Sequence, residues 1–131
     1  MSKCFGKNHF KDGEKVWFDN YAYPISDDIF VTRSDDPDKH TPINHSCEPN
    51  IWYDHGNENL YARINIKKGD QLTIDYATFI TNKTLQIECK CGQACCRKVI
   101  TSTDYMKQEL IDKYKGHYSC YLTTKVNYMR P

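Results

Sequence analysis

Cysteine is concentrated in one short stretch of this chain, at Cys89, Cys91, Cys95 and Cys96. The 131 residues contain seven cysteines, and an odd number cannot all pair within one molecule. Cys89, Cys91 and Cys96 lie within eight residues of one another, a density typical of metal ligation. Thiolates bind zinc well, and unpaired cysteines persist in a reducing compartment. We therefore expect a metal site in an intracellular protein rather than a framework of disulfides.

Two earlier segments also carry residue types suited to chemistry. The first is Asn44-His45-Ser46-Cys47-Glu48-Pro49-Asn50, and the second is the β-type run Leu72-Thr73-Ile74-Asp75-Tyr76, which ends on a phenol. Taken in order with the cysteine stretch and Arg97, these motifs resemble the SET domain followed by its post-SET zinc segment. The resemblance covers roughly residues 5–122, and the organisation is similar to small stand-alone SET proteins of bacterial or viral type.

This resemblance implies a protein-lysine N-methyltransferase that uses S-adenosylmethionine. The lysine ε-amine would displace the methyl group in line, so the site must align donor and acceptor. The amine must also be neutral, although its usual pKa is about 10.4, and desolvation in a narrow channel lowers that pKa. By resemblance, Asn44 and His45 bind the cofactor, and Tyr76 is catalytic with its hydroxyl beside the sulfonium and the amine. A pseudoknot would bring positions 44–46 beside positions 74–76.

The resemblance also implies which side chains form the channel for the substrate lysine. In SET enzymes, phenol or phenyl groups lining this channel control how many methyl groups are added. Ile74 occupies one such position and is not aromatic, whereas Tyr53 matches another and Phe79 is a third candidate. These signals conflict, so the sequence leaves mono-, di- and trimethylation open.

The metal ligands follow from the same family pattern. Cys89, Cys91 and Cys96 have the post-SET spacing, and the fourth thiolate in that family comes from the first motif, which is Cys47 here. Four thiolates around zinc make a closed, structural site, so we expect Zn²⁺ to support activity without taking part in the chemistry. Cys95 is an ambiguous neighbour, but Cys96 fits better because it directly precedes Arg97.

Composition excludes several other classes of protein. The formal net charge is +1, from 18 basic and 17 acidic residues, and provides no basic footprint for a nucleic-acid partner. No apolar run approaches the ~20 residues that a membrane span needs. No apolar segment follows the first seven residues, as a secretory signal would require. We therefore expect a protein or peptide lysine as partner, with neither nucleic acid nor membrane.

The elements that must position these motifs are short and separated by turns. We predict a mainly β, SET-type (β-clip-like) fold with a pseudoknot, a short C-terminal helix and a post-SET zinc segment. Polar turns with glycine at positions 13 and 69 separate strands. An insert spans about 19–42, mostly loop with a short strand at 29–31, and alternating apolar residues predict a strand over 60–66.

One helix is predicted near the end of the chain. Thr103 can cap it, Met106, Leu110 and Tyr114 recur at helical spacing, and Gly116 is placed to end it. These boundaries divide the chain into a SET domain over 1–88 and a post-SET zinc segment with C-terminal helix and tail over 89–131.

Two departures from the family pattern affect the predicted activity. SET domains open with a Gly-x-Gly strand against the cofactor, and in this alignment the chain begins after it, with Lys3 at the second glycine. We therefore expect a truncated N-terminal strand and weak cofactor binding. The residues before Asn44 also carry Thr41-Pro42 where the family has Arg-Phe. The alternative function is a catalytically weak or inactive SET module that binds peptide or protein; a zinc-dependent nucleic-acid module is disfavoured by the neutral charge.

Overall fold

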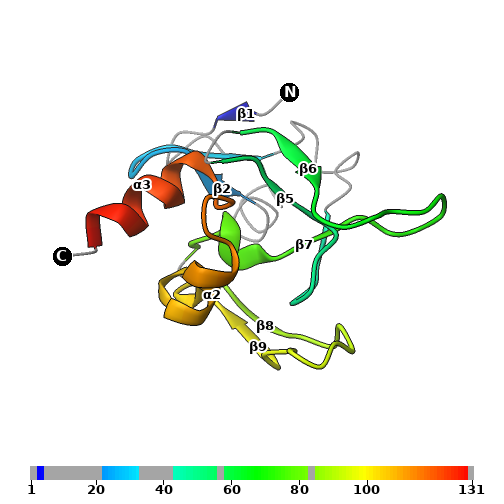
Figure 1. Cartoon of the computed structure of the whole chain (residues 1–131). Helices are drawn as coiled ribbons and strands as arrows, with labels where there is room; N and C mark the ends of the chain where they lie inside the picture. The colour runs from blue at the N-terminus through cyan, green and yellow to red at the C-terminus, as the bar shows by residue number, and fades with distance from the viewer. Residues whose placement is uncertain (1–2, 5–21, 33–42, 56–57, 83–84, 130–131) are drawn as a thin grey trace, which may run out of the picture.

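Among the residues that the structure describes, short strands make up most of the regular structure up to residue 101, and most of the helical structure follows them (Figure 1). The structure is a computed structural model, and it describes residues 3–4, 22–32, 43–55, 58–82 and 85–129. The mainly β architecture predicted from the sequence is confirmed. The expected turn at Gly13, the Thr41-Pro42 departure and most of the insert lie outside the described residues.

The strands form one three-stranded sheet and three two-stranded pairs within the described residues. The antiparallel sheet has the order β1-β3-β2, with bounds Lys3–Cys4 for β1, Phe30–Thr32 for β3 and Tyr23–Pro24 for β2. The only parallel pair described joins β4 (Asn44–His45) to β7 (Thr73–Ile74). The antiparallel pairs are β5 (Ile51–Tyr53) with β6 (Leu60–Ala62) and β8 (Gln86–Glu88) with β9 (Val99–Thr101). The predicted strand at 29–31 corresponds to β3, displaced by one residue.

The predicted strand over 60–66 is wrong beyond Ala62. The Arg63 N–H still donates to the Asn50 carbonyl at 2.8 Å, in register with the β5–β6 ladder, but the Asn50 N–H donates to the Thr73 carbonyl at 3.2 Å instead of returning to Arg63. Ile64 is then exposed rather than buried on a common face. The chain then turns at 67–70, where the Asp70 N–H donates to the Lys67 carbonyl at 3.0 Å. Gly69 has φ +93, as its predicted place in this turn requires.

The helices are Tyr76–Thr78 (η2), Asp104–Met106 (η3), Gln108–Lys113 (α2) and Cys120–Met129 (α3), of which η2 and η3 are 3₁₀ turns. The single helix predicted from Thr103 to Gly116 is therefore two pieces, because Lys107 is extended between them. Thr103 precedes η3 without a capping hydrogen bond, and Gly116 has φ +81 shortly after α2. No helix in the described part of the chain is long and apolar enough to cross a membrane.

Two hydrophobic clusters hold these short elements, because strands of two or three residues have little stability alone. One cluster packs around Tyr53, Ile74, Phe79 and Ile100. The other joins Ala77 to the C-terminal side chains Tyr105, Leu110, Tyr114, Tyr118, Leu122 and Val126. Residues 74–79 thus pack against the β core on one side and the C-terminal helices on the other.

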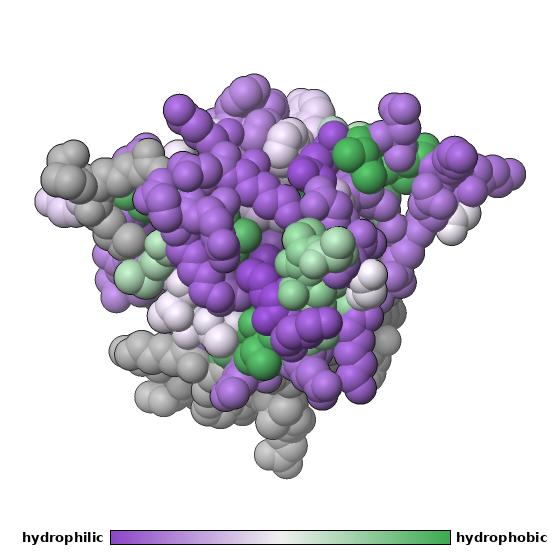
Figure 2. Space-filling model, turned by 60° about the horizontal axis from the view of Figure 1, so that its bottom comes forward, coloured by the Kyte–Doolittle hydropathy of each residue, from purple (hydrophilic) through white to green (hydrophobic). Residues whose placement is uncertain are grey.

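The β8–β9 hairpin pairs residues on both sides of the predicted domain boundary at 88/89. The boundary itself stays a prediction. The face that includes the lower end of Figure 1 is mostly hydrophilic, with hydrophobic residues in separate patches (Figure 2). On this face, the described apolar side chains therefore form no continuous hydrophobic surface.

Candidate active site and cysteine cluster

The parallel β4–β7 pair brings the Asn-His-Ser motif beside the segment that carries Tyr76. Asn44 pairs with Thr73 and His45 with Ile74, and the Ser46 N–H donates to the Ile74 carbonyl at 3.1 Å. Positions 44–46 therefore lie beside positions 73–76, as the resemblance implied. The pairing joins segments about thirty residues apart, which the spacing of the motifs alone could not have shown.

Asn50, the last residue of the first motif, extends this pairing through its side chain. Its Oδ1 accepts from the Thr73 N–H at 2.8 Å, and its Nδ2 donates to the Gln71 carbonyl at 2.8 Å. The amide thus replaces a missing backbone partner on β7. Asn50 had no predicted role, although its place in the motif was a signal for one.

Tyr76 is held by both its backbone and its hydroxyl. It begins the η2 turn, its N–H donates to His45 Nδ1 at 3.0 Å, and its hydroxyl donates to the Ile43 carbonyl at 2.7 Å. The imidazole packs edge-on against the phenol, with ring centroids 5.2 Å apart. The Tyr76 hydroxyl is thus held close to the backbone just before β4.

His45 is a neutral imidazole whose two nitrogens have different partners. Since Nδ1 accepts from the Tyr76 N–H, the proton of the neutral ring lies on Nε2, 3.3 Å from Cys47 Sγ. Burial lowers the pKa of His45 to about 4, although the Asp75 carboxylate opposes this shift. His45 therefore acts as a hydrogen-bonding link between the Tyr76 turn and a cysteine, and it stays uncharged at neutral pH.

Phe79 is the centre of an aromatic group that includes three tyrosines. Its ring centroid lies 5.8 Å from Tyr76, 6.0 Å from Tyr53 and 5.4 Å from Tyr23. Ile74 is fully buried in the same cluster. The three predicted channel residues thus lie close to Tyr76, and their role as a channel stays a prediction. Tyr23 was missed, because it falls in the segment read as an insert.

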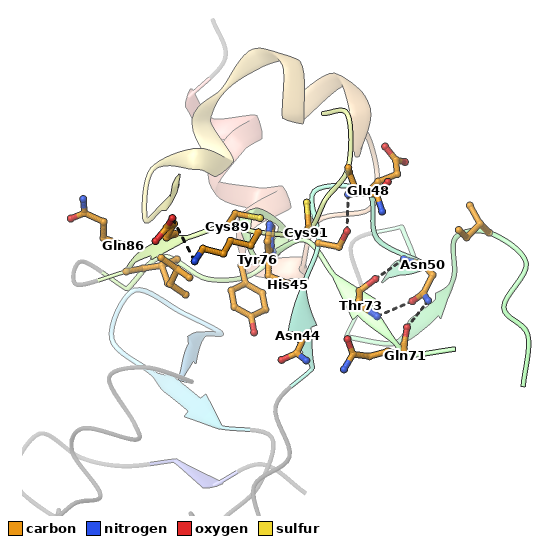
Figure 3. A pocket seen from close by; sticks show the side chains of 17 residues that line it. Asn44, His45, Glu48, Asn50, Gln71, Thr73, Tyr76, Gln86, Cys89 and Cys91 are labelled. Carbon is orange, nitrogen blue, oxygen red and sulfur yellow. Dashed lines mark hydrogen bonds and ion pairs between the residues drawn. The ribbon is translucent and has the colours of Figure 1, made fainter. Parts of the chain in front are cut away.

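A pocket of about 910 Å³ is lined by Tyr76, but not by Phe79, Tyr53 or Ile74 (Figure 3). Asn44, His45 and Tyr76 line it from β4 and η2, and part of the post-SET segment, including Cys89 and Cys91, lines it as well. This volume lies within the range of pockets that hold small-molecule ligands or cofactors. The predicted cofactor-binding residues therefore share one cavity.

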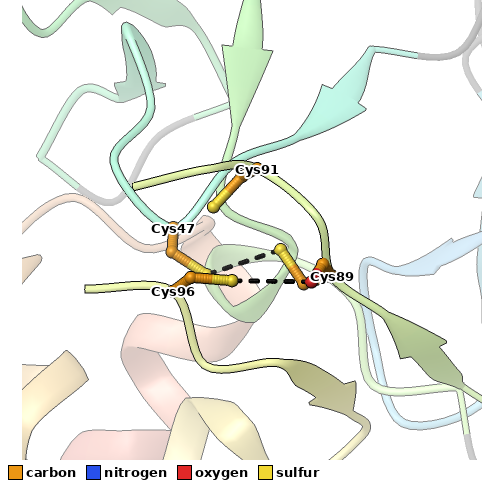
Figure 4. A group of neighbouring side chains, drawn as sticks. All are labelled: Cys47, Cys89, Cys91 and Cys96. Carbon is orange, nitrogen blue, oxygen red and sulfur yellow. Dashed lines mark hydrogen bonds between the residues drawn. The ribbon is translucent and has the colours of Figure 1, made fainter. Parts of the chain in front are cut away.

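The four predicted metal ligands come together in space (Figure 4). The Sγ atoms of Cys47, Cys89, Cys91 and Cys96 all lie within 4.8 Å of one another, and Cys47 and Cys89 are 3.8 Å apart. Tetrahedral zinc with Zn–S bonds of ~2.3 Å requires sulfur atoms roughly 3.8 Å apart. The size and composition of the cluster are therefore compatible with a zinc ion.

The surroundings of the cluster also suit a bound cation. Burial raises the pKa of Cys89 to about 12 and raises that of Cys47, whereas at Cys91 burial is outweighed by backbone hydrogen bonds, which lower the pKa to about 6. Four adjacent thiolates would therefore need a positive ion. Cys47 Sγ has two N–H groups nearby, His45 Nε2 at 3.3 Å and the Arg97 backbone N–H at 3.4 Å. Donors of this kind stabilise ligating thiolates and fix their orientation.

Cys95 lies outside this cluster. Its thiol is exposed and is 3.4 Å from the Cys47 carbonyl and 3.5 Å from Glu48 Oε2. Lys113 donates to the same two acceptors at 2.7 and 3.0 Å, and the Arg63 guanidinium also donates to Glu48. The loop that carries Cys47 is therefore anchored by α2 and by the segment after β6.

A buried ion-pair network connects the cysteine cluster to the Tyr76 turn. The Arg97 guanidinium donates to both oxygens of Asp75, at 2.7 and 2.8 Å, and its Nε donates to Asp104 at 3.2 Å. The Tyr114 hydroxyl donates to Asp75 at 2.8 Å. Burial would raise the pKa of Asp75, but Arg97 outweighs it and holds that pKa below its usual value. This network was not predicted from the sequence.

Comparison with known proteins places this geometry in a family. Residues 4–77, more than half of the chain, match the SET domain. The chain belongs to the SET-domain family. The expected SET-type fold is thereby confirmed, and the cysteine cluster is compatible with the post-SET zinc segment.

Several histone-lysine methyltransferases are similar to this SET-domain chain. It is 34% identical over 84 residues to histone-lysine N-methyltransferase ASHH3 of Arabidopsis thaliana, covering 60% of the chain and 23% of that relative. It is 31% identical over 94 residues to histone H3-lysine(4) N-trimethyltransferase ATX1 of Arabidopsis thaliana, covering 67% and 9%. It is 33% identical over 76 residues to histone-lysine N-methyltransferase Su(var)3-9 of Drosophila melanogaster, covering 44% and 12%.

The chain spans about a quarter or less of the length of the curated relatives that it matches. No solved structure gives a significant match to the chain.

Proposed function

We propose that this SET domain transfers a methyl group from S-adenosylmethionine to the ε-amine of lysine in a protein substrate. The observation that carries this proposal is the pocket wall formed by Asn44, His45 and Tyr76. Family membership and the histone-lysine methyltransferases among the relatives support the same reaction. We infer that the cofactor occupies this pocket, with its methionine end toward Asn44.

Bound S-adenosylmethionine supplies an electrophilic methyl group, which the lysine nitrogen takes as the carbon–sulfur bond breaks. The protein's part is to align the two reactants and remove water. The Tyr76 hydroxyl, which donates to the Ile43 carbonyl, would lie beside the reacting atoms. Its position is fixed at the backbone by His45, which stays neutral and takes no proton in this mechanism.

The aromatic group around Phe79 would line the path of the substrate lysine. Tyr53, Phe79 and Ile74 are buried around Tyr76, and such an environment disfavours a charged ammonium. The neutral amine that reacts is thereby favoured over the protonated amine. Tyr23 joins Tyr53 as a phenol in contact with Phe79, so either one can influence how many methyl groups are added.

Zinc would be held by Cys47, Cys89, Cys91 and Cys96 as a structural ion with four protein ligands. Cys47 belongs to the Asn-His-Ser loop, and the other three belong to the segment that also lines the pocket. Their common attachment would keep the two walls of the pocket together. The chain's own residues, rather than the metal, would contact the reacting groups.

Two measurements together test this proposal. Calorimetry should detect S-adenosylmethionine binding by the wild type, and Asn44→Ala should weaken it about tenfold, the value of one hydrogen bond to a charged group. Asn65→Ala, an exposed asparagine outside the pocket, is the matched control. Labelled cofactor should then transfer methyl groups to lysine in histone H3 or in proteins of a cell lysate. Peptide binding with neither cofactor binding nor transfer would establish the inactive-module alternative instead.

A further inference from the structure

Arg97 contacts both the cysteine cluster and the turn that carries Tyr76. It directly follows Cys96 in the sequence, and its backbone N–H lies 3.4 Å from Cys47 Sγ. Its side chain extends the other way, where the guanidinium pairs with both oxygens of Asp75. One residue therefore connects two ligands of the predicted metal site to the residue that precedes Tyr76.

Asp75 passes this connection to the backbone of the η2 turn. Its carboxylate is fully buried, and its Oδ1 accepts from the Ala77 N–H at 2.9 Å, which caps the turn that begins at Tyr76. Its Oδ2 also accepts from the Tyr114 hydroxyl. The Thr78 hydroxyl donates to the Asp75 carbonyl at 2.7 Å. Four groups thus fix Asp75, and Asp75 fixes the start of the turn.

Arginine is suited to this place in a way that lysine is not. The planar guanidinium matches both carboxylate oxygens at once and still has Nε free to donate to Asp104 at 3.2 Å. Asp104 is itself buried and is held by Thr101. A lysine would keep the charge, but its single ammonium could not make these three directed hydrogen bonds.

We infer that Arg97 is a positioning residue, which couples the order of the cysteine cluster to the position of Tyr76. The expected effect of Arg97 on kcat rests on the proposed function, whereas its expected effect on the order of the η2 turn does not. Loading the cluster with zinc fixes Cys96 and Cys47 and with them the Arg97 backbone. The Arg97 side chain then holds Asp75 and the N–H groups of the η2 turn in place.

Amide hydrogen exchange tests the structural consequence without any assay of activity. Tyr114→Phe removes one hydrogen bond to Asp75, whereas Tyr118→Phe removes a similar buried bond, to the Tyr105 carbonyl at 3.0 Å, in the same hydrophobic cluster. In zinc-loaded protein, we expect exchange in a peptide covering 73–80 to rise at least about threefold in Tyr114→Phe only. Removal of zinc by a chelator should raise it in the wild type. Two results would overturn the coupling. One is an equal exchange rate of this peptide in both variants, and the other is an exchange rate in the wild type that the chelator does not raise.

Kinetics of Arg97→Lys test the catalytic consequence. We expect kcat to fall about tenfold or more, since a small misplacement of a positioned group can cost ~100-fold in rate. The KM for cofactor should stay within about threefold and zinc content should be unchanged. Lys107→Ala is the matched control, because Lys107 also pairs with Asp104, at 3.2 Å, but not with Asp75.

Two results would contradict the positioning role of Arg97. One is unchanged kcat in Arg97→Lys, and the other is loss of activity only in proportion to lost zinc. If the wild type transfers no methyl group, the proposed function fails, and the exchange experiment still decides the coupling between the cluster and the turn.

Discussion

At the scale of single residues, the site is built from side chains that bond to backbone atoms of other motifs. His45 accepts from the Tyr76 N–H, Asn50 bonds to the backbone at 71 and 73, and Tyr76 donates to the Ile43 carbonyl. A hydrogen bond to a backbone atom fixes the position of such a side chain whatever rotamer the partner residue adopts. The motif residues are thus constrained by one another as well as by the ligands they are proposed to bind.

Substitution of single cysteines should distinguish the predicted zinc ligands from the neighbouring Cys95. We predict that Cys47→Ser loses zinc, because three thiolates leave an incomplete site, and that the fold is destabilised with it. Cys95→Ser should retain one zinc per chain, since Cys95 Sγ lies outside the cluster. Elemental analysis of protein purified without chelator measures this directly. Equal zinc in both variants would remove Cys47 from the ligand set.

The number of methyl groups added should depend on the phenols around Phe79. We predict that Tyr53→Phe shifts products toward higher methylation states, because a phenol that hydrogen-bonds the amine or its water restricts further addition. Mass spectrometry of the product lysine measures this shift. An unchanged distribution in Tyr53→Phe, together with a shift in Tyr23→Phe, would assign the role to the phenol that the sequence did not indicate.

At the scale of elements, the C-terminal helix α3 packs against the η2 turn and stabilises it. Leu122 is fully buried and Val126 is nearly so, and both pack in the cluster that includes Ala77 next to Tyr76. The Ser119 N–H, just before the helix, donates to the Thr78 carbonyl at 2.8 Å. The helix is therefore joined to the η2 turn by packing and by the backbone.

Truncation of this packing should cost stability. We predict that Leu122→Ala lowers the free energy of unfolding by about 2–5 kcal/mol, the usual cost of a cavity left by leucine. Asn127→Ala, on the exposed face of the same helix, should change it by less than about 0.5 kcal/mol. Urea unfolding of zinc-loaded protein compares the two. Similar effects in both variants would mean that α3 does not pack as described.

The elements that the sequence failed to predict share a physical reason. In α3, Thr123, Thr124 and Val126 are weak helix formers, so tertiary packing rather than propensity determines the helix. In the segment 60–66, alternating apolar residues suggested one long strand, but the Asn50 N–H bonds to the Thr73 carbonyl instead of pairing with Arg63, so the ladder ends there. Local patterns do not contain such contacts.

What could be predicted was the chemistry of short motifs. The structure brings together the four predicted cysteines and the motif residues around Tyr76, because each motif keeps a fixed spacing that the family resemblance interprets. Their roles as metal ligands and cofactor-binding residues stay predictions. The Arg97–Asp75 pair could not be predicted, since a pairing of opposite charges 22 residues apart has many competitors in this chain. Tyr23 was missed because it lies in the segment that the sequence indicated as an insert.

At the scale of the whole molecule, the two hydrophobic clusters meet at residues 74–79. Tyr76 therefore lies between the β core and the C-terminal helices, with the pocket on one side. The cysteine cluster and the Arg97 network join the post-SET segment to this junction. The stability of the fold and the geometry of the site consequently depend on the same contacts. The ionisation of the buried tyrosine hydroxyls near this junction reports on that stability.

Alkaline unfolding should report on the buried phenols. Burial, with the Asp75 carboxylate adding to it, raises the pKa of Tyr114 and Tyr118 far above the usual ~10. Their contribution is fully present below pH ~10. This contribution is lost at higher pH, because the phenols ionise in the unfolded chain before they ionise in the folded one. The free energy of unfolding then falls by about 1.4 kcal/mol per pH unit for each phenol.

We predict that Tyr114→Phe reduces the slope of stability against pH above 10 by about one proton, as does Tyr118→Phe. The exposed Tyr128→Phe should leave it unchanged. Urea unfolding between pH 9 and ~11 measures these slopes. Wild-type slopes in all three variants would contradict the burial of both hydroxyls.

The proposed reaction is tested most directly by replacing the Tyr76 hydroxyl alone. Wild type, Tyr76→Phe and Tyr61→Phe would be compared for methyl transfer from labelled S-adenosylmethionine to protein lysine, with zinc content and thermal unfolding measured in parallel. Tyr61 is an exposed tyrosine outside the pocket and serves as the control. We predict that Tyr76→Phe loses most of its kcat, with a smaller rise in KM and intact fold and zinc, while Tyr61→Phe keeps wild-type activity. Near-normal turnover by Tyr76→Phe would contradict the catalytic role of Tyr76, and absence of lysine methylation by the wild type would contradict the proposed function itself.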